Sequence, residues 1–149
     1  MHTTLQKTLV KILLAEDDAD DRFFFTKALN ELAIDTHLTM VQDGEALMEH
    51  LLTHLNDLPD VLFLDLSMPR KSGFECLTEI KEELKLMDLP VIMFSTAYPR
   101  DYNYEQSIAK MLLTIGAHDF IRKPSGFKEL KAVIFASLSK LMEKKVITS

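Results

Sequence analysis

Short apolar runs alternate along this chain with longer segments of helical periodicity. The short runs are four or five residues long, and Val61–Leu64 is wholly apolar, as is typical of a strand that is covered on both faces of a sheet. We expect five of these strands, at Lys11–Ala15, His37–Val41, Val61–Leu64, Val91–Ser95 and Asp119–Arg122.

Between these runs, apolar residues recur at spacings of three and four, which predicts amphipathic helices. The first helix has one apolar stripe, made of Phe24, Phe25, Ala28, Leu29 and Leu32. The same spacing places Leu84 on the buried face of the third helix and Gly116 at the end of the fourth. The helices are expected at Asp20–Leu32, Gly44 to about Leu55, Phe74–Met87, Gln106–Ile115 and Gly126–Lys145. Strand followed by helix, five times over, predicts an α/β fold with a doubly wound parallel sheet and helices on both faces.

Charged residues stand at the ends of three of the predicted strands. Glu16, Asp17 and Asp18 follow the first strand, Asp65 closes the third, and Lys123 follows the fifth. The carboxyl ends of parallel strands meet at one edge of the sheet, where such folds bind ligands. A divalent cation and a phosphoryl group would bridge these charges.

Composition narrows the function classes. The 149 residues suit one domain, and 47% hydrophobic residues are enough for a core. The net charge of −6 disfavours direct nucleic-acid binding. Cys76 is the only cysteine, so no disulfide forms within the chain, and Met1–Val10 has neither a signal-peptide pattern nor a membrane span. We therefore expect a cytoplasmic protein without membrane insertion.

Taken together, these motifs resemble the receiver domain of two-component response regulators, in the single-domain form of the chemotaxis regulators. The matching stretches are Ile12–Asp18, Asp65–Pro69 with Gly73, Ser95–Ala97 and Lys123–Pro124. The resemblance implies a flavodoxin-like fold with five strands in the order 2-1-3-4-5. It also implies a single receiver domain over residues 1–149, with its core at about 9–145.

The resemblance also implies roles for the residues at the strand ends. Asp65 would be the phosphoacceptor, assisted by Mg²⁺, with Mn²⁺ as a substitute. Asp17, Asp65 and the backbone carbonyl of Ser67 would bind the metal directly, and Glu16 would bind it through a water molecule. Asp18 would lie outside the metal group and cap the first helix.

Further residues would contact the phosphoryl group or respond to it. Lys123 and the hydroxyl of Ser95 would bind phosphoryl oxygens, as would the backbone N–H groups of Ser67 and Thr96. Ser95 and Phe120 would form the conformational switch, unless Phe120 is only a core residue. A cis peptide bond between Lys123 and Pro124 would aim the lysine at the site.

This interpretation makes the chain a phosphoacceptor signalling protein that assists its own phosphorylation and dephosphorylation, and not an enzyme in the ordinary sense. Its partners would be a sensor histidine kinase or a histidine phosphotransfer protein, and a downstream protein target. The aromatic loop Tyr98–Tyr104 would contact either a distinct partner or a second copy of the chain, which would give a homodimer.

Two other functions compete with this one. A receiver-like interaction module would lack phosphotransfer, whereas the set of site residues here is intact. A phosphohydrolase of the haloacid dehalogenase type would need an Asp two residues after its nucleophile, where this chain has Ser67.

Several other motifs have simpler interpretations than a binding site. Asp18, Asp20 and Asp21 fit the solvated start of a helix. The pair His50 and His54 has metal-ligand spacing without an evident third ligand, and an exposed helix face is favoured. The run Phe23–Phe25 is interpreted as core packing.

Overall fold

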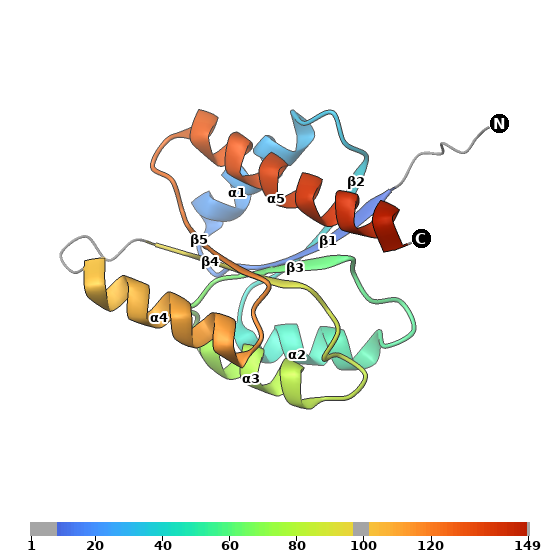
Figure 1. Ribbon diagram of the computed structural model, residues 1–149, viewed down its shortest axis with the longest axis vertical. Coiled ribbons are helices and arrows are strands. Elements are labelled where there is room, and N and C mark those ends of the chain that lie inside the picture. The colour runs from blue at the N-terminus through green and yellow to red at the C-terminus, as the bar shows by residue number, and fades with distance from the viewer. Residues whose placement is uncertain (1–8, 97–101, 149) are drawn as a thin grey trace.

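The computed structural model describes residues 9–96 and 102–148, with the side chains of residue 102 and residues 144–148 left out. Strands and helices alternate throughout (Figure 1). The elements are β1 Val10–Ala15, α1 Ala19–Asn30, β2 Thr36–Val41, α2 Gly44–Thr53, β3 Val61–Leu64, α3 Gly73–Glu82, β4 Val91–Ser95, α4 Tyr102–Ile115, β5 Asp119–Arg122 and α5 Phe127–Thr148. The predicted sequence of elements is confirmed.

The five strands form one parallel sheet in the order β2-β1-β3-β4-β5, as predicted. Strand β1 lies between β2 and β3, so the strand order reverses there. In this register Ala15 pairs with Val41 on one side and with Leu64 on the other. The residues that follow β1 and β3 are therefore neighbours at the carboxyl edge of the sheet.

Helices cover both faces of the sheet. Helices α1 and α5 lie on one face, and α2, α3 and α4 lie on the other (Figure 1). Because side chains alternate along a strand, Ile12 and Leu14 pack with Phe25 of α1, whereas Leu13 and Ala15 belong to the core on the other face. Burial on both faces is the reason that the central strands β1, β3 and β4 are almost wholly apolar, whereas the edge strands β2 and β5 are only partly buried and carry more polar residues.

The third and fourth helices do not have the predicted bounds. Helix α3 ends at Glu82 rather than Met87, and the Leu84 side chain, predicted to be buried, is 82% exposed. The Lys81 ammonium donates hydrogen bonds to the carbonyls of Met87 and Leu89, which holds the chain in a turn after the helix.

Helix α4 begins at Tyr102, four residues before the predicted start. Its first turn carries Glu105, whose buried carboxylate pairs with Arg122 of β5. The predicted loop Tyr98–Tyr104 is therefore helical from residue 102 onward, and residues 97–101 lie outside the described part of the chain. At the other end, Gly116 follows the helix with φ of 135°, a conformation that favours glycine.

The prediction that Phe23–Phe25 belong to the core is correct only for Phe25. Phe23 and Phe24 are exposed, because three successive residues on a helix cannot all face the sheet. The Phe24 ring lies 6.4 Å from the ring of Phe127 in α5, between centroids. Among the helices that the structure describes, none combines the length and the apolar character needed to span a bilayer.

Candidate functional site

Three carboxylates meet at the carboxyl edge of the sheet. Each of Glu16, Asp17 and Asp65 places an oxygen within 4.8 Å of the oxygens of the other two. Glu16 and Asp65 are buried, and Asp17 is exposed to solvent. Carboxylate oxygens gathered in this way suit a hard divalent cation such as Mg²⁺, which keeps several of its waters. The structure thus brings together the carboxylates that the sequence predicted as metal ligands.

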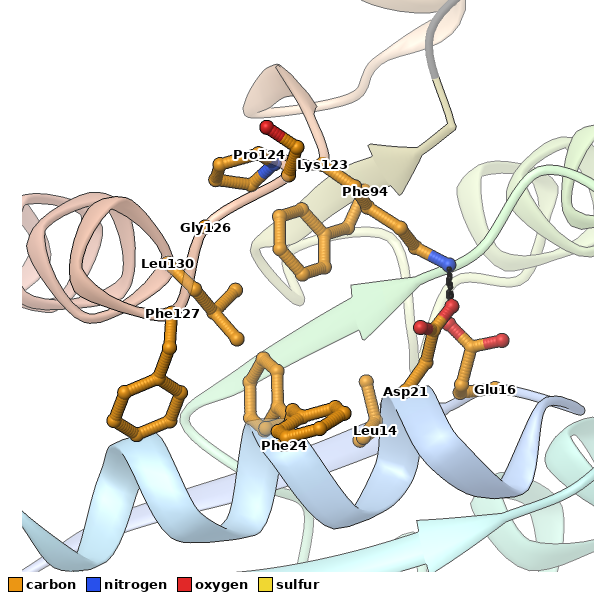
Figure 2. Close-up of a pocket in the computed structure, with 12 residues that line it drawn as sticks. Leu14, Glu16, Asp21, Phe24, Phe94, Lys123, Pro124, Gly126, Phe127 and Leu130 are labelled. Carbon is orange, nitrogen blue, oxygen red and sulfur yellow. Dashed lines mark hydrogen bonds and ion pairs between the residues drawn. The ribbon is translucent and has the colours of Figure 1, made fainter.

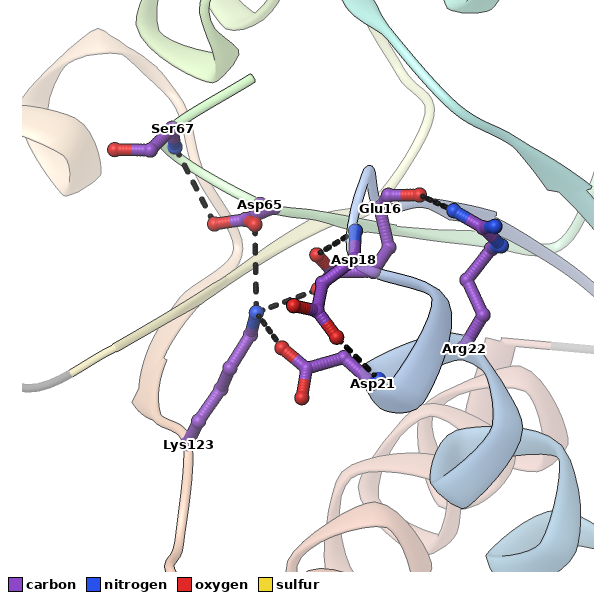
Figure 3. A network of polar contacts seen from close by, with 7 residues as sticks. All are labelled: Glu16, Asp18, Asp21, Arg22, Asp65, Ser67 and Lys123. Atoms are coloured by element: carbon purple, nitrogen blue, oxygen red, sulfur yellow. Dashed lines mark hydrogen bonds and ion pairs between the residues drawn. The ribbon is translucent and has the colours of Figure 1, made fainter.

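The Lys123 ammonium lies beside the carboxylates of Glu16 and Asp65 (Figure 3). Its Nζ atom is 2.5 Å from Glu16 and 3.3 Å from Asp65. The backbone N–H of Lys123 donates a hydrogen bond of 2.7 Å to the carbonyl of Ser95. This bond ties the end of β5 to the end of β4, and so directs the lysine toward the acidic cluster.

A third carboxylate on Lys123, that of Asp21, was not predicted from the sequence. Its oxygen lies 3.0 Å from Nζ of Lys123, although the sequence had assigned it to a solvated helix start. Asp21 stands four residues after Asp17, in the first turn of α1. A carboxylate in the first turn of the helix that begins just after the predicted metal ligands was the signal that could have found it.

The charges of the site shift the pKa values of two groups. Burial raises the pKa of Glu16 to about 7, against the hydrogen bond from Lys123, and the charge of Asp65 raises it further. Burial lowers the pKa of Lys123, but the hydrogen bond to Glu16 and the charge of Asp65 outweigh burial, so this pKa is raised. The lysine is therefore charged at neutral pH, whereas Glu16 is poised between its two forms. A bound cation would favour the ionised form of Glu16.

Hydrogen bonds from the start of α1 hold Glu16 in place. Its side chain accepts from the backbone N–H of Asp18 at 3.1 Å, and its carbonyl accepts from the Arg22 guanidinium at 2.9 Å. The Asp18 carboxylate accepts from the N–H of Asp21 at 2.9 Å, which confirms Asp18 as the helix cap.

The loop between β3 and α3 approaches Asp65 closely. The N–H of Gly73 donates to the carbonyl of Leu66 at 2.9 Å, and a Cβ atom on Gly73 would lie only 2.1 Å from the carbonyl oxygen of Asp65. Glycine is therefore required at position 73. In this loop the N–H of Ser67 donates to the Asp65 carboxylate at 3.3 Å, so Ser67 lies beside Asp65.

The predicted switch residues lie on the neighbouring strands. Ser95 is buried at the end of β4, and Thr96 follows it in an exposed position. Phe120 pairs with Met93 in the sheet and packs, half-buried, against the core on the α3 and α4 side.

The predicted cis peptide bond between Lys123 and Pro124 is wrong, because this bond is trans. The trans form is the more favourable one for most bonds that precede proline. The contacts of Lys123 with the carboxylates form with the bond in this state.

A cavity of about 310 Å³ opens beside the acidic cluster, between α1 and α5 (Figure 2). Glu16, Asp21 and Lys123 lie at its polar end. The rest of its lining is mainly apolar, with Leu14, Phe24, Phe25, Phe94, Pro124, Ser125, Gly126, Phe127 and Leu130. Its walls come from segments that are far apart in the chain, so local sequence patterns did not reveal it.

The other candidate residues do not join a site within the described residues. The rings of His50 and His54 stack at 4.3 Å between centroids, and the His54 Nδ1 atom lies 2.7 Å from the His50 carbonyl oxygen. In the part of the chain that the structure describes, no group of three metal-ligating side chains includes them. Cys76 is buried, and burial raises the pKa of its thiol to about 12, which leaves it unreactive at neutral pH.

The chain is similar to known signalling proteins. Residues 12–135 match the family model described as the response regulator receiver domain. Over 126 residues the chain is 26% identical to a probable methanogenesis regulatory protein, FilR2, of Methanothrix harundinacea, covering 83% of this chain and 77% of FilR2. It is 34% identical to the response regulator Rcp1 of Synechocystis over 94 residues, which are 60% of this chain and 64% of Rcp1.

Solved structures show the same fold. The Mn²⁺-bound form of Rcp1 superposes with a TM-score of 0.71 at 27% identity, covering 84% of this chain and 88% of that one. The phosphorylated cyanobacterial phytochrome response regulator RcpA superposes with a TM-score of 0.73 at 27% identity, covering 85% and 89%.

Proposed function

Because the chain belongs to the response regulator receiver domain family, we propose that Asp65 accepts a phosphoryl group from a phosphohistidine of a partner protein. The observation that carries this proposal is the position of Asp65 itself. Its carboxylate is buried at a strand end, 3.3 Å from the Lys123 ammonium and within a cluster of carboxylates. A nucleophile, a fixed positive charge and a metal-binding group are the parts that phosphoryl transfer requires.

In the proposed reaction, a carboxylate oxygen of Asp65 attacks the phosphorus atom of the phosphohistidine. The new P–O bond forms as the P–N bond breaks, and the imidazole nitrogen leaves with its electron pair and takes a proton from solvent. Lys123 stabilises the negative charge on the phosphoryl oxygens. The N–H groups of Ser67 and Thr96, and the hydroxyl of Ser95, supply further hydrogen bonds to the same oxygens.

A divalent cation belongs to this proposal, and Mg²⁺ is the cation we propose. Asp17, Asp65 and the carbonyl of Ser67 would hold it directly, and Glu16 through a water molecule. When bound, the ion would neutralise charge on the phosphoryl group and on the carboxylates. The hard oxygen donors would accept Mn²⁺ as well, the ion that is bound in the solved structure of Rcp1.

The phosphorylated state would be transmitted through Ser95 and Phe120. Phosphorylation would draw the Ser95 hydroxyl toward the phosphoryl group and leave room for the Phe120 ring to turn inward. This change alters the surface formed by β4, α4 and β5. A downstream protein target would recognise that surface, and a sensor histidine kinase or a histidine phosphotransfer protein would supply the phosphoryl group.

The cytoplasmic location of the protein remains a prediction.

Intact mass spectrometry tests the proposal. The full chain is incubated with acetyl phosphate and Mg²⁺, and we expect the mass of one added phosphoryl group. Asp65→Asn removes the nucleophile and should abolish the adduct, whereas Asp88→Asn, at an exposed turn, should keep it. An unmodified wild-type chain, or an adduct that survives in Asp65→Asn, would show that the proposed function is wrong.

A further inference from the structure

The Lys123 ammonium has three N–H groups, and each faces a different carboxylate. These belong to Glu16 at 2.5 Å, Asp21 at 3.0 Å and Asp65 at 3.3 Å. An ammonium has no further hydrogen to donate. A phosphoryl oxygen can therefore gain a bond from Lys123 only when one of the three carboxylates gives it up.

Asp21 is the carboxylate best placed to be displaced. Its side chain is 43% exposed, compared with 3% for Glu16 and 9% for Asp65. Asp21 also lies at the polar end of the cavity, where water can replace the lysine as its partner (Figure 2). Losing an ion pair costs an exposed carboxylate much less than a buried one.

Resting on the function proposed above, we propose that Asp21 is a positioning residue that acts through Lys123. Its carboxylate holds the lysine between phosphorylation events and competes with the phosphoryl group for the same ammonium. Asp21 thereby sets the balance between the two charged ligands of the site: it favours the divalent cation and opposes the phosphoryl anion.

Asp21 affects the two ligands in opposite directions because one ligand is a cation and the other is an anion. Asp21 adds one negative charge beside the carboxylates of Glu16, Asp17 and Asp65, which already attract a cation and repel an anion. Removing that charge weakens the attraction for a cation and strengthens the attraction for an anion. It also weakens the bond to one N–H of Lys123, because an amide oxygen accepts less strongly than a carboxylate, and Asp21→Ala frees that N–H completely for the phosphoryl oxygens. A side chain needed only for correct folding would change the binding of both ligands in the same direction.

The structure offers a control for the other role of Asp21, as an acidic residue at a helix start. Asp20 is an exposed acid in the same first turn of α1. Neutralising either residue removes the same favourable interaction with the helix dipole. The capping bond uses the backbone N–H of Asp21 and the side chain of Asp18, so Asp21→Asn leaves it intact.

The experiment compares Asp21→Asn with Asp20→Asn by calorimetric titration, first with Mg²⁺ alone. Beryllofluoride, an anion that mimics a phosphoryl group, is then titrated at a Mg²⁺ concentration that saturates each variant. For Asp21→Asn we expect Mg²⁺ affinity to fall about two- to fivefold and beryllofluoride affinity to rise by a similar factor, the range for a partly exposed ion pair. Asp20→Asn should match the wild type in both titrations.

Two further variants distinguish the effect of the Asp21 charge from an effect of misfolding. Asp21→Ala is also neutral and should repeat the opposite shifts, and Asp21→Glu restores the charge and should return both affinities toward wild type. Equal affinities in wild type and Asp21→Asn, or a loss of both, would overturn the role of Asp21 alone. A wild-type chain that binds no beryllofluoride and forms no phosphoryl adduct would overturn the proposed function together with it.

Discussion

The Lys123 ammonium lies 2.5 Å from the Glu16 carboxylate, although 107 residues separate them in the chain. Both side chains are largely buried, with 13% and 3% of their surface exposed. Burial raises the pKa of Glu16 to about 7 even though the lysine opposes this shift. The pair is therefore one in which a proton or a metal ion can change the balance of charge near neutral pH.

The titration of Glu16 should make the metal-free chain more stable as the pH falls, which is the opposite of the usual effect of a carboxylate. The pKa of Glu16 is about 7 in the fold and about 4.5 in the unfolded chain, so the folded state takes up a proton first as the pH falls. The titration of Glu16 should then contribute about 1 kcal/mol of added stability between pH 8 and pH 6.5. Thermal unfolding in a chelating buffer should show an increase in Tm of about 2–4 °C.

Glu16→Gln should remove this part of the pH dependence, and Glu45→Gln, an exposed residue of α2, should keep it. Burial lowers the pKa of His50, so the titration of His50 reduces stability as the pH falls. This effect is the same in the wild type, in Glu16→Gln and in Glu45→Gln, and it cancels when their pH dependences are compared. The same slope in Glu16→Gln as in the wild type would contradict the prediction.

Binding of Mg²⁺ should release protons near neutral pH. The metal requires ionised carboxylates, and Glu16, with its pKa of about 7, is partly protonated there. The affinity should weaken about tenfold between pH 8 and pH 6. Calorimetric titration in two buffers of different ionisation enthalpy measures both the affinity and the number of protons released. Equal affinities at the two pH values would argue against Glu16 as a member of the metal group.

Lys123→Met should separate metal binding from phosphorylation. Without the lysine, the carboxylates lose their competing cation, so Mg²⁺ should bind more tightly. Phosphorylation by acetyl phosphate should slow on the order of a hundredfold, because the phosphoryl oxygens lose their fixed positive charge. Lys128→Met, at an exposed position in the first turn of α5, is the matched control for both measurements. An unchanged phosphorylation rate in Lys123→Met would show that the lysine takes no part in the reaction.

The two glycines near the site should respond differently to alanine. In Gly73→Ala the new Cβ would meet the backbone carbonyl of Asp65, which cannot move away, and we expect a loss of about 1–3 kcal/mol. In Gly126→Ala it would meet the flexible end of the Glu129 side chain, and the loss should stay below about 1 kcal/mol. Urea unfolding measures both values, and similar losses would contradict the close approach at position 73.

A single tryptophan can report on the proposed switch, because the chain contains none. Phe120→Trp places the indole, half-buried, on β5, where an inward turn would change its emission. We expect Mg²⁺ with beryllofluoride to shift the emission spectrum of this variant. In Phe135→Trp, on the exposed face of α5, the same ligands should have no effect. If Phe120→Trp binds beryllofluoride without a change in its emission, Phe120 is only a core residue and not part of the switch.

Much of the fold could be predicted from local patterns. The runs Val61–Leu64 and Val91–Ser95 were predicted with their observed bounds, because strands buried on both faces leave continuous apolar sequence. The ends of two helices could not be predicted in this way. Helix α3 stops early where Lys81 binds carbonyls beyond it, and α4 starts early where Glu105 reaches Arg122.

The sequence by itself determined which charged residues stand at the strand ends, and parallel pairing then placed Glu16, Asp17, Asp65 and Lys123 at one edge of the sheet. Three features were decided only by the tertiary structure: the contact of Asp21 with Lys123, the cavity between α1 and α5, and the trans bond before Pro124. The physical reason is that strand ends follow from the periodicity of the chain. Contacts between side chains depend instead on how separate helices pack across the sheet, which no local pattern records.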